Sequence, residues 1–434
     1  MIIHPYTFRI STLLLETIQR KKYSLDKAFN NILLKYKDIK NPNQVYEITE
    51  KSLKNFAIAD YILVKSGYIN ISLRRKSAFR IAYSLVINYN ISLNEIKFIS
   101  GGLLSSKLLR LLEKDKINNI IQEILSLEKI KKFSLIYSTP PWIIKILLKN
   151  IEEKKVERIL EKNKKRIYWL RINTLTAKVN DIVKKLKKNN IEFTIDDDFP
   201  FLLKISRIDS RIKFHKLYIK LKYQVILQDK GSIIVVKSLD PQKNDIILDI
   251  AAAPGLKTSL IQQYTNNNSN IIAIDISNKR VLEAKKLLKS LRVKNVSFIT
   301  ADGTSIKFTK KFNKILLDAP CSNSGAIRTD PAIRLILWNN PDLKIFHIIQ
   351  KKLLNKAINL LAKDGILLYS TCSFSPVEGE KHFDKLLETA SNIRLKPNIN
   401  AWEGYKNYRC SRYVRRLFPY PHDTIGFFIA RLLK

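Results

Sequence analysis

The sequence predicts an α/β protein, with a mostly parallel, doubly wound sheet in its C-terminal part. A small α+β subdomain and an all-α N-terminal domain are expected to precede that sheet. Three observations support this fold class: helical periodicity through residues 5–127, a proline-containing break at 138–142, and short apolar runs alternating with helical stretches from residue 245 onward. Continuous apolar strands separated by helices are typical of a parallel sheet covered on both faces.

The all-α domain is expected to span residues 1–137. Ser24 is a suitable N-cap for the helix that follows it. In the preceding helix, apolar residues recur at helical spacing, namely Phe8, Leu14, Leu15 and Ile18. Two basic clusters, residues 74–76 and Lys107 with Arg110, are suited to contact phosphate groups, although solvated helix faces have the same composition and are the commoner case.

The α+β subdomain is expected at residues 138–240. A helical stretch at 143–160 precedes a strand-like run at 168–173, and a second helix at 179–188 precedes another strand near 191–195.

The last domain is expected to span residues 241–434. Its predicted parallel strands are the apolar runs 246–248, 271–274, 296–299, 315–317 and 366–369. Ligands of such sheets bind beyond the carboxyl ends of the strands. The residues with evident chemistry follow the ends of these runs, so we expect one site at this edge.

The charge of the chain favours a polyanionic partner. Its 78 Lys and Arg residues outnumber 38 Asp and Glu residues, which gives a formal net charge of +40, and 45% of the residues are hydrophobic, enough for a packed core. Nucleic acid is the first candidate partner. Abundant Lys, Ile and Asn with few Gly also fit a drift toward AT-rich codons, so the charge alone does not establish that partner.

The three cysteines, Cys321, Cys372 and Cys410, are too few for a disulfide framework and indicate a reducing compartment. The N-terminal residues lack the pattern of a secretion signal, and no apolar run is long enough to span a bilayer. We therefore expect a cytoplasmic protein without a membrane partner, and a monomer.

The loop at residues 249–258 predicts a cofactor site. Its small residues let the backbone approach a ligand, but it lacks the spaced glycines of a phosphate loop or of a dinucleotide fingerprint. Asp275, Asp302 and Asp318 end the next three strands, where carboxylates suit ribose hydroxyls and an exocyclic amine. A single acidic strand end is commonly a helix cap, whereas a series of them favours a nucleoside cofactor without a pyrophosphate.

Cys321 and Cys372 each follow the end of a predicted strand. Taken alone, either is more often a small buried apolar residue than a catalyst. No CxxC pair or His cluster suggests a metal, and none is expected. Two thiols beside a nucleoside cofactor suit methylation of carbon 5 of a cytosine. A thiolate adds to carbon 6, and a second group removes the carbon-5 proton before the thiol departs. Asp318 is placed to bond the N3 edge of the base.

These segments resemble the Nol1/Nop2/Sun family of RNA cytosine-5 methyltransferases. The resemblance rests on five ordered motifs at strand ends, with two upstream strings at 169–173 and 228–232, and covers the motifs 249–258, 273–277, 301–304, 317–322 and 370–373. The helical N-terminal region also resembles the antitermination factor NusB, which narrows the likeness to bacterial members acting on 16S ribosomal RNA.

The resemblance implies a Rossmann-like methyltransferase domain that uses S-adenosylmethionine and no metal. It implies that Cys372 is the nucleophile, that Cys321 assists product release, and that Asp318 contributes to catalysis. The implied cofactor-binding residues are Ala251, Ala252, Ala253, Pro254, Gly255, Leu256, Lys257, Asp275, Asp302 and Asp318.

Four positions depart from the family pattern. They are Leu256 in place of a second glycine, Ala332 in place of an acidic residue, Gly379 in place of an asparagine, and Ile425 in place of an aspartate. None removes a catalytic group. Two alternatives to an RNA methyltransferase remain open: a non-catalytic RNA-binding assembly factor that keeps the fold, and a DNA cytosine methyltransferase in which Cys321 attacks.

Overall fold

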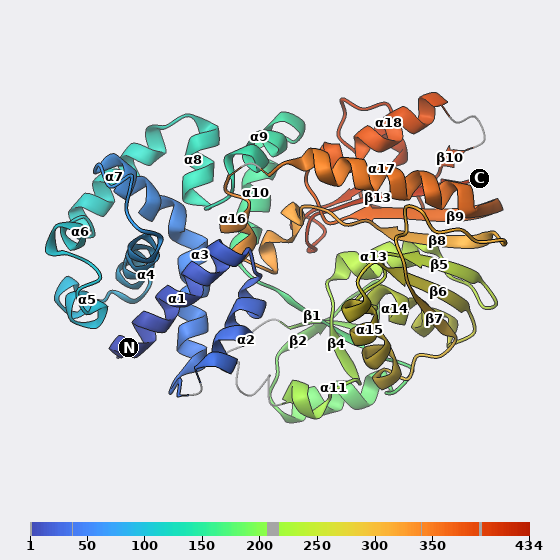
Figure 1. Cartoon of the computed structure of the whole chain (residues 1–434), viewed down its shortest axis with the longest axis horizontal. Coiled ribbons are helices and arrows are strands. Elements are labelled where there is room, and N and C mark those ends of the chain that lie inside the picture. The colour runs from blue at the N-terminus through green and yellow to red at the C-terminus, as the bar shows by residue number, and fades with distance from the viewer. Residues whose placement is uncertain (1, 37, 206–216, 340, 390–392) are drawn as a thin grey trace. The chain divides into compact units, whose positions relative to one another are not determined.

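The computed structural model of the chain describes residues 2–36, 38–205, 217–339, 341–389 and 393–434. The chain forms two compact units, each of two segments (Figure 1). The first, which we call the helical unit, comprises Met1–Lys164 and Asp330–Pro341. The second, which we call the sheet unit, comprises Lys165–Thr329 and Asp342–Lys434.

In its described residues, the helical unit contains helices and no strand. These are α1 (Pro5–Lys21), α2 (Leu25–Lys35), α3 (Pro42–Lys65), α4 (Leu73–Tyr89), α5 (Leu93–Ser100), α6 (Ser106–Arg110), α7 (Lys114–Ser126), α8 (Lys129–Ile136), α9 (Pro141–Asn150), α10 (Glu153–Lys164) and α16 (Ala332–Ile336). Ser24 accepts a hydrogen bond from the Lys27 backbone N–H, which confirms its predicted role as an N-cap. Phe8, Leu14 and Phe56 are fully buried in a large apolar cluster of this unit.

The helical unit also contains residues 138–164 and 330–341, which the sequence pattern assigned to the two later domains. The second segment contributes Ala332 to the core, where an acidic side chain would be buried. Arg334 fixes it further by donating hydrogen bonds to the backbone oxygens of Tyr137 (2.6 Å) and Asn163 (2.8 Å). Burial lowers the pKa of this guanidinium to about 10.

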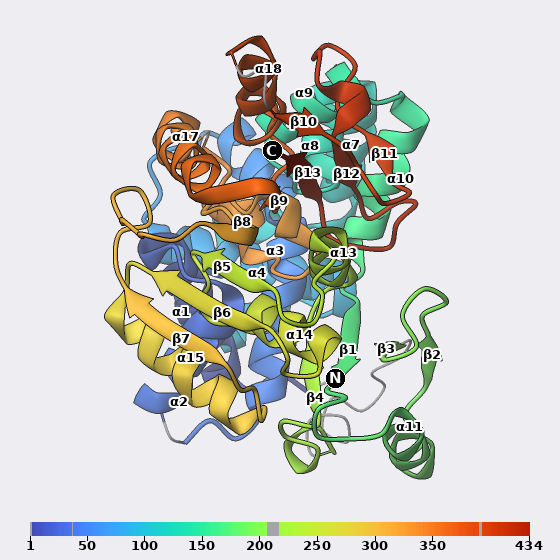
Figure 2. The ribbon, with the colours of Figure 1, turned by 90° about the vertical axis from the view of Figure 1, so that its right-hand side faces the viewer.

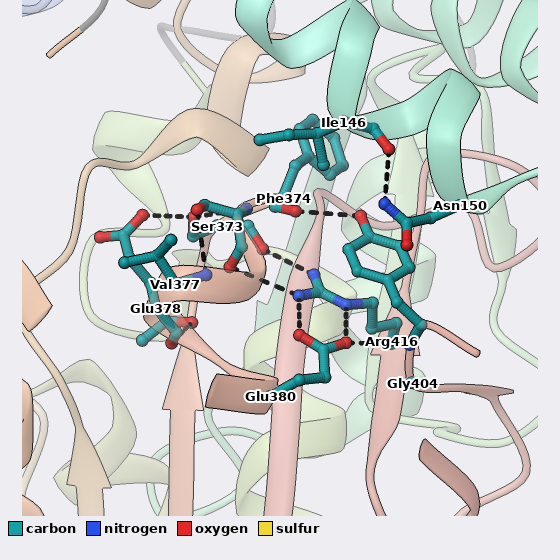
Figure 3. A network of polar contacts seen from close by, with 12 residues as sticks. Ile146, Asn150, Ser373, Phe374, Val377, Glu378, Glu380, Gly404 and Arg416 are labelled. Atoms are coloured by element: carbon teal, nitrogen blue, oxygen red, sulfur yellow. Dashed lines mark hydrogen bonds and ion pairs between the residues drawn. The ribbon is translucent and has the colours of Figure 1, made fainter. Parts of the chain in front are cut away.

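The single helix predicted at 143–160 is wrong, because two helices, α9 and α10, cover this stretch. Ile151 between them has extended backbone angles. The Asn150 side chain donates a hydrogen bond to the Ile146 carbonyl (2.8 Å) in the last turn of α9 (Figure 3). Apolar periodicity continues through the break, so the pattern gave no sign of it.

A four-stranded antiparallel sheet begins the sheet unit. Its order is β2-β3-β1-β4, with β1 (Tyr168–Ile172), β2 (Phe193–Ile195), β3 (Leu202–Ile205) and β4 (Val225–Leu227). Helix α11 (Val179–Lys188) packs Ile182 and Leu186 against Leu170 and Ile172 of β1. The strands predicted at 168–173 and near 191–195 and the helix between them are confirmed.

The main sheet has nine strands in the order β11-β12-β13-β9-β8-β5-β6-β7, with β10 paired to β13. Five neighbouring strands are parallel: β5 (Ile246–Ile250), β6 (Asn270–Asp275), β7 (Val296–Thr300), β8 (Phe312–Asp318) and β9 (Leu361–Thr371). Four more extend it beyond β9 by antiparallel pairing: β10 (Arg394–Leu395), β11 (Trp402–Glu403), β12 (Arg415–Leu417) and β13 (Phe427–Leu433). The predicted parallel sheet is thus confirmed, with an antiparallel extension.

Helices cover both faces of the main sheet, as Figure 2 shows. Ile247 of β5 faces a cluster with residues of α13 (Lys230–Leu239) and α14 (Leu256–Thr265), whereas the adjacent Leu248 faces a cluster with residues of α17 (Leu343–Leu360). Neighbouring residues of one strand are therefore both buried, which explains the continuous apolar runs. Helices α15 (Asn278–Ser290) and α18 (Glu380–Thr389) complete the layers, and no helix among the described residues is long and apolar enough to cross a membrane.

Candidate active site

Strand register brings the predicted site residues to one edge of the main sheet. Asp318 at the end of β8 pairs with Ser370 of β9, and Ile250 at the end of β5 pairs with Leu317 of β8. Asp275 ends β6 one strand further along. Because these strands are parallel and in level register, the loops that follow them emerge side by side.

The loop after β5 turns sharply into α14. Ala251 and Gly255 both have left-handed backbone angles, with φ of 64° and 95°. A Cβ on Gly255 would lie 2.5 Å from a methyl carbon of Leu288, so only glycine fits there. Leu256, which departs from the family pattern, begins α14 and lies half-buried without blocking this turn.

Lys257 and Asp318 form an ion pair at the centre of this edge. The Lys257 Nζ lies 2.5 Å from Oδ2 of Asp318, and the Ser370 hydroxyl donates to Oδ1 of the same carboxylate (2.6 Å). Burial alone would lower the pKa of Lys257, but the Asp318 carboxylate outweighs it and the pKa is raised. The sequence predicted both residues, and the structure brings them into direct contact.

Asp275 fixes the loop that follows β5. Its buried carboxylate accepts hydrogen bonds from the backbone N–H groups of Ala253 (3.2 Å) and Ser277 (3.0 Å), and Arg280 pairs with it (3.1 Å). Asp302, by contrast, is exposed and accepts a hydrogen bond from the Thr304 N–H, which lowers the pKa of its carboxyl.

Asp249 was not predicted as a site residue on its own, yet its carboxyl is unusual. It is 1% exposed, and Oδ2 accepts a hydrogen bond from the Thr258 hydroxyl (2.6 Å) while Oδ1 has no hydrogen-bond partner. Burial raises the pKa of Asp249 to about 7, and the nearby Asp318 charge adds to the shift. It lies at the start of the loop 249–258, which the sequence analysis predicted as a cofactor site.

The thiols of Cys321 and Cys372, both predicted to be catalytic, lie in contact. Cys321 Sγ lies 3.2 Å from Cys372 Sγ, and both cysteines are half-buried. The hydrogen bond with Cys372, together with burial, holds the pKa of Cys321 well above its usual range. Cys410 is fully buried in an apolar cluster and lies outside this pair.

Glu378 ties the two cysteine loops together, and the sequence analysis missed it. Its carboxylate is fully buried, and it accepts hydrogen bonds from the Ser322 hydroxyl (2.6 Å) and the Ser373 hydroxyl (2.5 Å). It also accepts one from the Ser322 N–H (2.8 Å). Since Ser322 follows Cys321 and Ser373 follows Cys372, one carboxylate positions both thiols.

A buried ion pair between Arg416 and Glu380 supports the loop that follows Cys372 (Figure 3). Arg416 and Glu380 are both 0% exposed, and two guanidinium nitrogens lie 2.6 Å from the two carboxylate oxygens. Arg416 also donates to the Ser373 carbonyl (3.0 Å), and its guanidinium lies 4.0 Å from the Tyr405 ring centre. The pair therefore fixes the backbone next to the predicted nucleophile.

Gly379 departs from the family pattern at the same place. A Cβ there would lie 2.7 Å from the Phe428 ring, so the loop between Glu378 and Glu380 accepts only glycine opposite this ring. Ile425 is buried, and its N–H bonds the Asp229 carboxylate (3.2 Å). Neither departure removes a group from the thiol pair.

No group of three or more His, Cys, Asp or Glu side chains in the described part of the chain is arranged to hold a metal ion. The site instead combines a thiol pair, a lysine–aspartate pair and a tight small-residue loop. This set suits covalent chemistry on a base beside an organic cofactor.

Comparisons with known proteins match two stretches of the chain to family models. Residues 236–433 match the family model "16S rRNA methyltransferase RsmB/F", and residues 139–208 match the model of the ferredoxin-like domain of the same proteins. The chain is 29% identical over 280 residues to ribosomal RNA small subunit methyltransferase F of Serratia proteamaculans, covering 61% of this chain and 56% of that protein. It thus spans little more than half of that relative.

Two archaeal proteins are matched over nearly their full length. The tRNA (cytosine(49)-C(5))-methyltransferase of Pyrococcus abyssi is 30% identical over 315 residues, which cover 66% of this chain and 97% of that protein. A solved methyltransferase homolog from Pyrococcus horikoshii is 30% identical with a TM-score of 0.61, covering 71% of this chain and all of the other.

We expect Glu380→Ala to lower the free energy of unfolding by about 3–5 kcal/mol, because it leaves the Arg416 charge buried without its partner. The matched control is Glu388→Ala, which breaks the exposed Glu388–Arg409 pair and should cost about 1 kcal/mol or less. Urea unfolding followed by circular dichroism measures both. Equal losses for the two variants would contradict a structural role for the buried pair.

Asp249 should make stability depend on pH. Its folded pKa of about 7 lies above its ordinary value of 3.8, so between these values the folded state holds a proton that the unfolded state has lost. Stability from this group therefore falls as pH rises from about 4 to 7. Asp249→Asn has no carboxyl to titrate, so its free energy of unfolding should not fall in this way. The free energy of unfolding of the variant relative to that of the parent protein should therefore rise with pH, by about 1.4 kcal/mol for each unit of pKa shift. Unfolding measured across this range checks it, and a constant difference would refute it.

Proposed function

Because the chain belongs to the RsmB/F family of RNA cytosine-C5 methyltransferases, we propose that it methylates carbon 5 of a cytosine in 16S ribosomal RNA. The helical unit is proposed to be NusB-like, which is why we compare the chain with bacterial RsmB. The observation that carries the proposal is the pair of sulfurs, 3.2 Å apart, at the ends of adjacent parallel strands. Incorporation of tritiated methyl groups into 16S RNA, mapped by bisulfite sequencing, tests it.

S-adenosylmethionine supplies the methyl group when bound, and the residues at this edge suit it. The Asp249 oxygen without a partner is an acceptor for the cofactor's ammonium group, and the Gly255 turn leaves room for close backbone approach. We assign the remaining contacts to Ala251–Lys257, Asp275 and Asp302. Leu256 replaces a glycine in this set without closing the turn.

In the proposed mechanism, the Cys372 thiolate adds to carbon 6 of the cytosine, and carbon 5 becomes nucleophilic. Addition at carbon 6 makes N3 basic enough to take a proton from solvent, and the Asp318 carboxylate, held by Lys257 and Ser370, accepts a hydrogen bond from this edge of the base. After methyl transfer, Cys321 takes the proton from carbon 5, and the sulfur of Cys372 leaves carbon 6 as the double bond re-forms.

The raised pKa of Cys321 is consistent with this order. The main cause is its hydrogen bond to the sulfur of Cys372. Once Cys372 is bound to carbon 6, its sulfur carries no charge and no proton, so that cause disappears and the Cys321 pKa falls. Cys321 thus remains a neutral thiol during attack, and it loses its proton to solvent before it takes the proton from carbon 5.

The helical unit and the net charge of +40 are proposed to bind the ribosomal RNA, with the protein acting as a cytoplasmic monomer. A non-catalytic assembly factor is the second candidate. It has little support, because both thiols, the lysine–aspartate pair and the Glu378 contacts are all intact.

Asp275→Ala should weaken S-adenosylmethionine binding by about 1.5–3 kcal/mol, or about ten- to hundredfold, because it removes a charged acceptor and releases Ala253. Calorimetry measures the affinity. Asp197→Ala, at an exposed aspartate, serves as the control and should bind like the parent protein. Unchanged affinity in Asp275→Ala would show that the residue does not serve the cofactor.

The two thiols are separated by single substitutions. Cys372→Ala should neither methylate nor form an adduct. Cys321→Ala should attack and transfer the methyl group but then stall, which leaves a methylated protein–RNA band on denaturing electrophoresis. The buried Cys410→Ala should behave like the parent protein. A band with Cys372→Ala instead would make Cys321 the nucleophile, as in DNA enzymes, and normal methylation by both variants would make the thiols structural.

A further inference from the structure

Asn323 stands next to both thiols but is not part of the scheme above. It lies two residues after Cys321, at the start of the short helix η1 (Ser324–Arg328), with left-handed backbone angles (φ 59°). Its side chain makes no capping hydrogen bond to that helix. Asparagine commonly adopts this conformation, so the backbone alone does not indicate a function. The contacts of its side chain, in contrast, do indicate a function.

The carboxamide of Asn323 contacts the sulfurs. Its Oδ1 lies 2.8 Å from Cys372 Sγ and 3.7 Å from Cys321 Sγ. The shorter contact connects it to the proposed nucleophile, and Cys372 comes from a strand 49 residues further along the chain. A side chain with only a local turn role would not reach a thiol on another strand.

The backbone around Asn323 is fixed from both sides. The Gly325 N–H donates to the Cys372 carbonyl (3.0 Å), and the Ser324 hydroxyl accepts a hydrogen bond from the Phe374 N–H (3.0 Å). A Cβ on Gly325 would lie 2.2 Å from the Gly426 carbonyl oxygen, so the two loops pack at backbone contact. The amide is therefore held at the sulfur by a rigid support.

We propose that Asn323 is a third catalytic side chain, which stabilises the thiolate of Cys372; this rests on the proposed function. In the thiol form, the Cys372 S–H donates to Oδ1. When the proton leaves to solvent, rotation of the amide by half a turn places its NH₂ group at the same position, where it donates to the negative sulfur. The amide thereby serves both protonation states of Cys372.

Alkylation of Cys372 by iodoacetamide, quantified by mass spectrometry of its peptide across a pH series, tests this without RNA or cofactor. Asn323→Gly removes the amide while glycine accepts the left-handed backbone. We expect alkylation of Cys372 at low pH to be about tenfold slower than in the parent protein, because the thiolate loses the amide that donates a hydrogen bond to it. Asn323→Asp should slow alkylation further, because a carboxylate repels the thiolate.

The matched control is Asn90→Gly, at an exposed left-handed asparagine (φ 54°) that ends α4 and lies far from Cys372 in sequence. Its alkylation profile should equal that of the parent protein. An unshifted profile for Asn323→Gly, with Asn323→Asp also unshifted, would overturn the assignment even if the protein methylates RNA. A shifted profile in a protein that methylates no RNA would leave the role of Asn323 standing and sink the proposed function instead.

Discussion

The parallel register between β8 and β9 is the constraint on which the site depends. It sets Asp318 opposite Ser370, so the chain after each strand reaches its cysteine at the same level. A shift by one residue would turn the apolar side chains of these buried strands to the wrong faces. Apolar packing on both sides of the sheet therefore fixes the strand register, and the register in turn places the two sulfurs close together.

Strand register alone does not hold the loops that carry Cys321 and Cys372 in contact. Buried charged side chains also fix these loops. Glu378 accepts hydrogen bonds from both loops, and the Arg416–Glu380 pair fixes the backbone behind them. Buried ion pairs contribute little net stability compared with apolar residues of similar size. Here they define one arrangement of polar backbone groups in a region where apolar contacts would allow several.

Much of the fold could be predicted because each apolar run and each helix carries its own periodicity. The acidic strand ends and the two cysteines were found for the same reason, since parallel strands share one edge. Glu378 and Asn323 were missed because each also bonds a residue about fifty positions away, Ser322 and Cys372 respectively, and no local pattern indicates such a contact. The break at Ile151 and the inclusion of residues 330–341 in the helical unit were missed because tertiary packing decides them.

Residues 330–341 belong to the helical unit, although the residues on either side of them belong to the sheet unit. The chain crosses between them at 164/165, 329/330 and 341/342, so neither unit is one continuous stretch. A fragment beginning at residue 165 would keep Ala332 and Leu335 but lack the core that buries them. Such a fragment would therefore expose the apolar side chains of a twelve-residue segment that belongs structurally to the other unit.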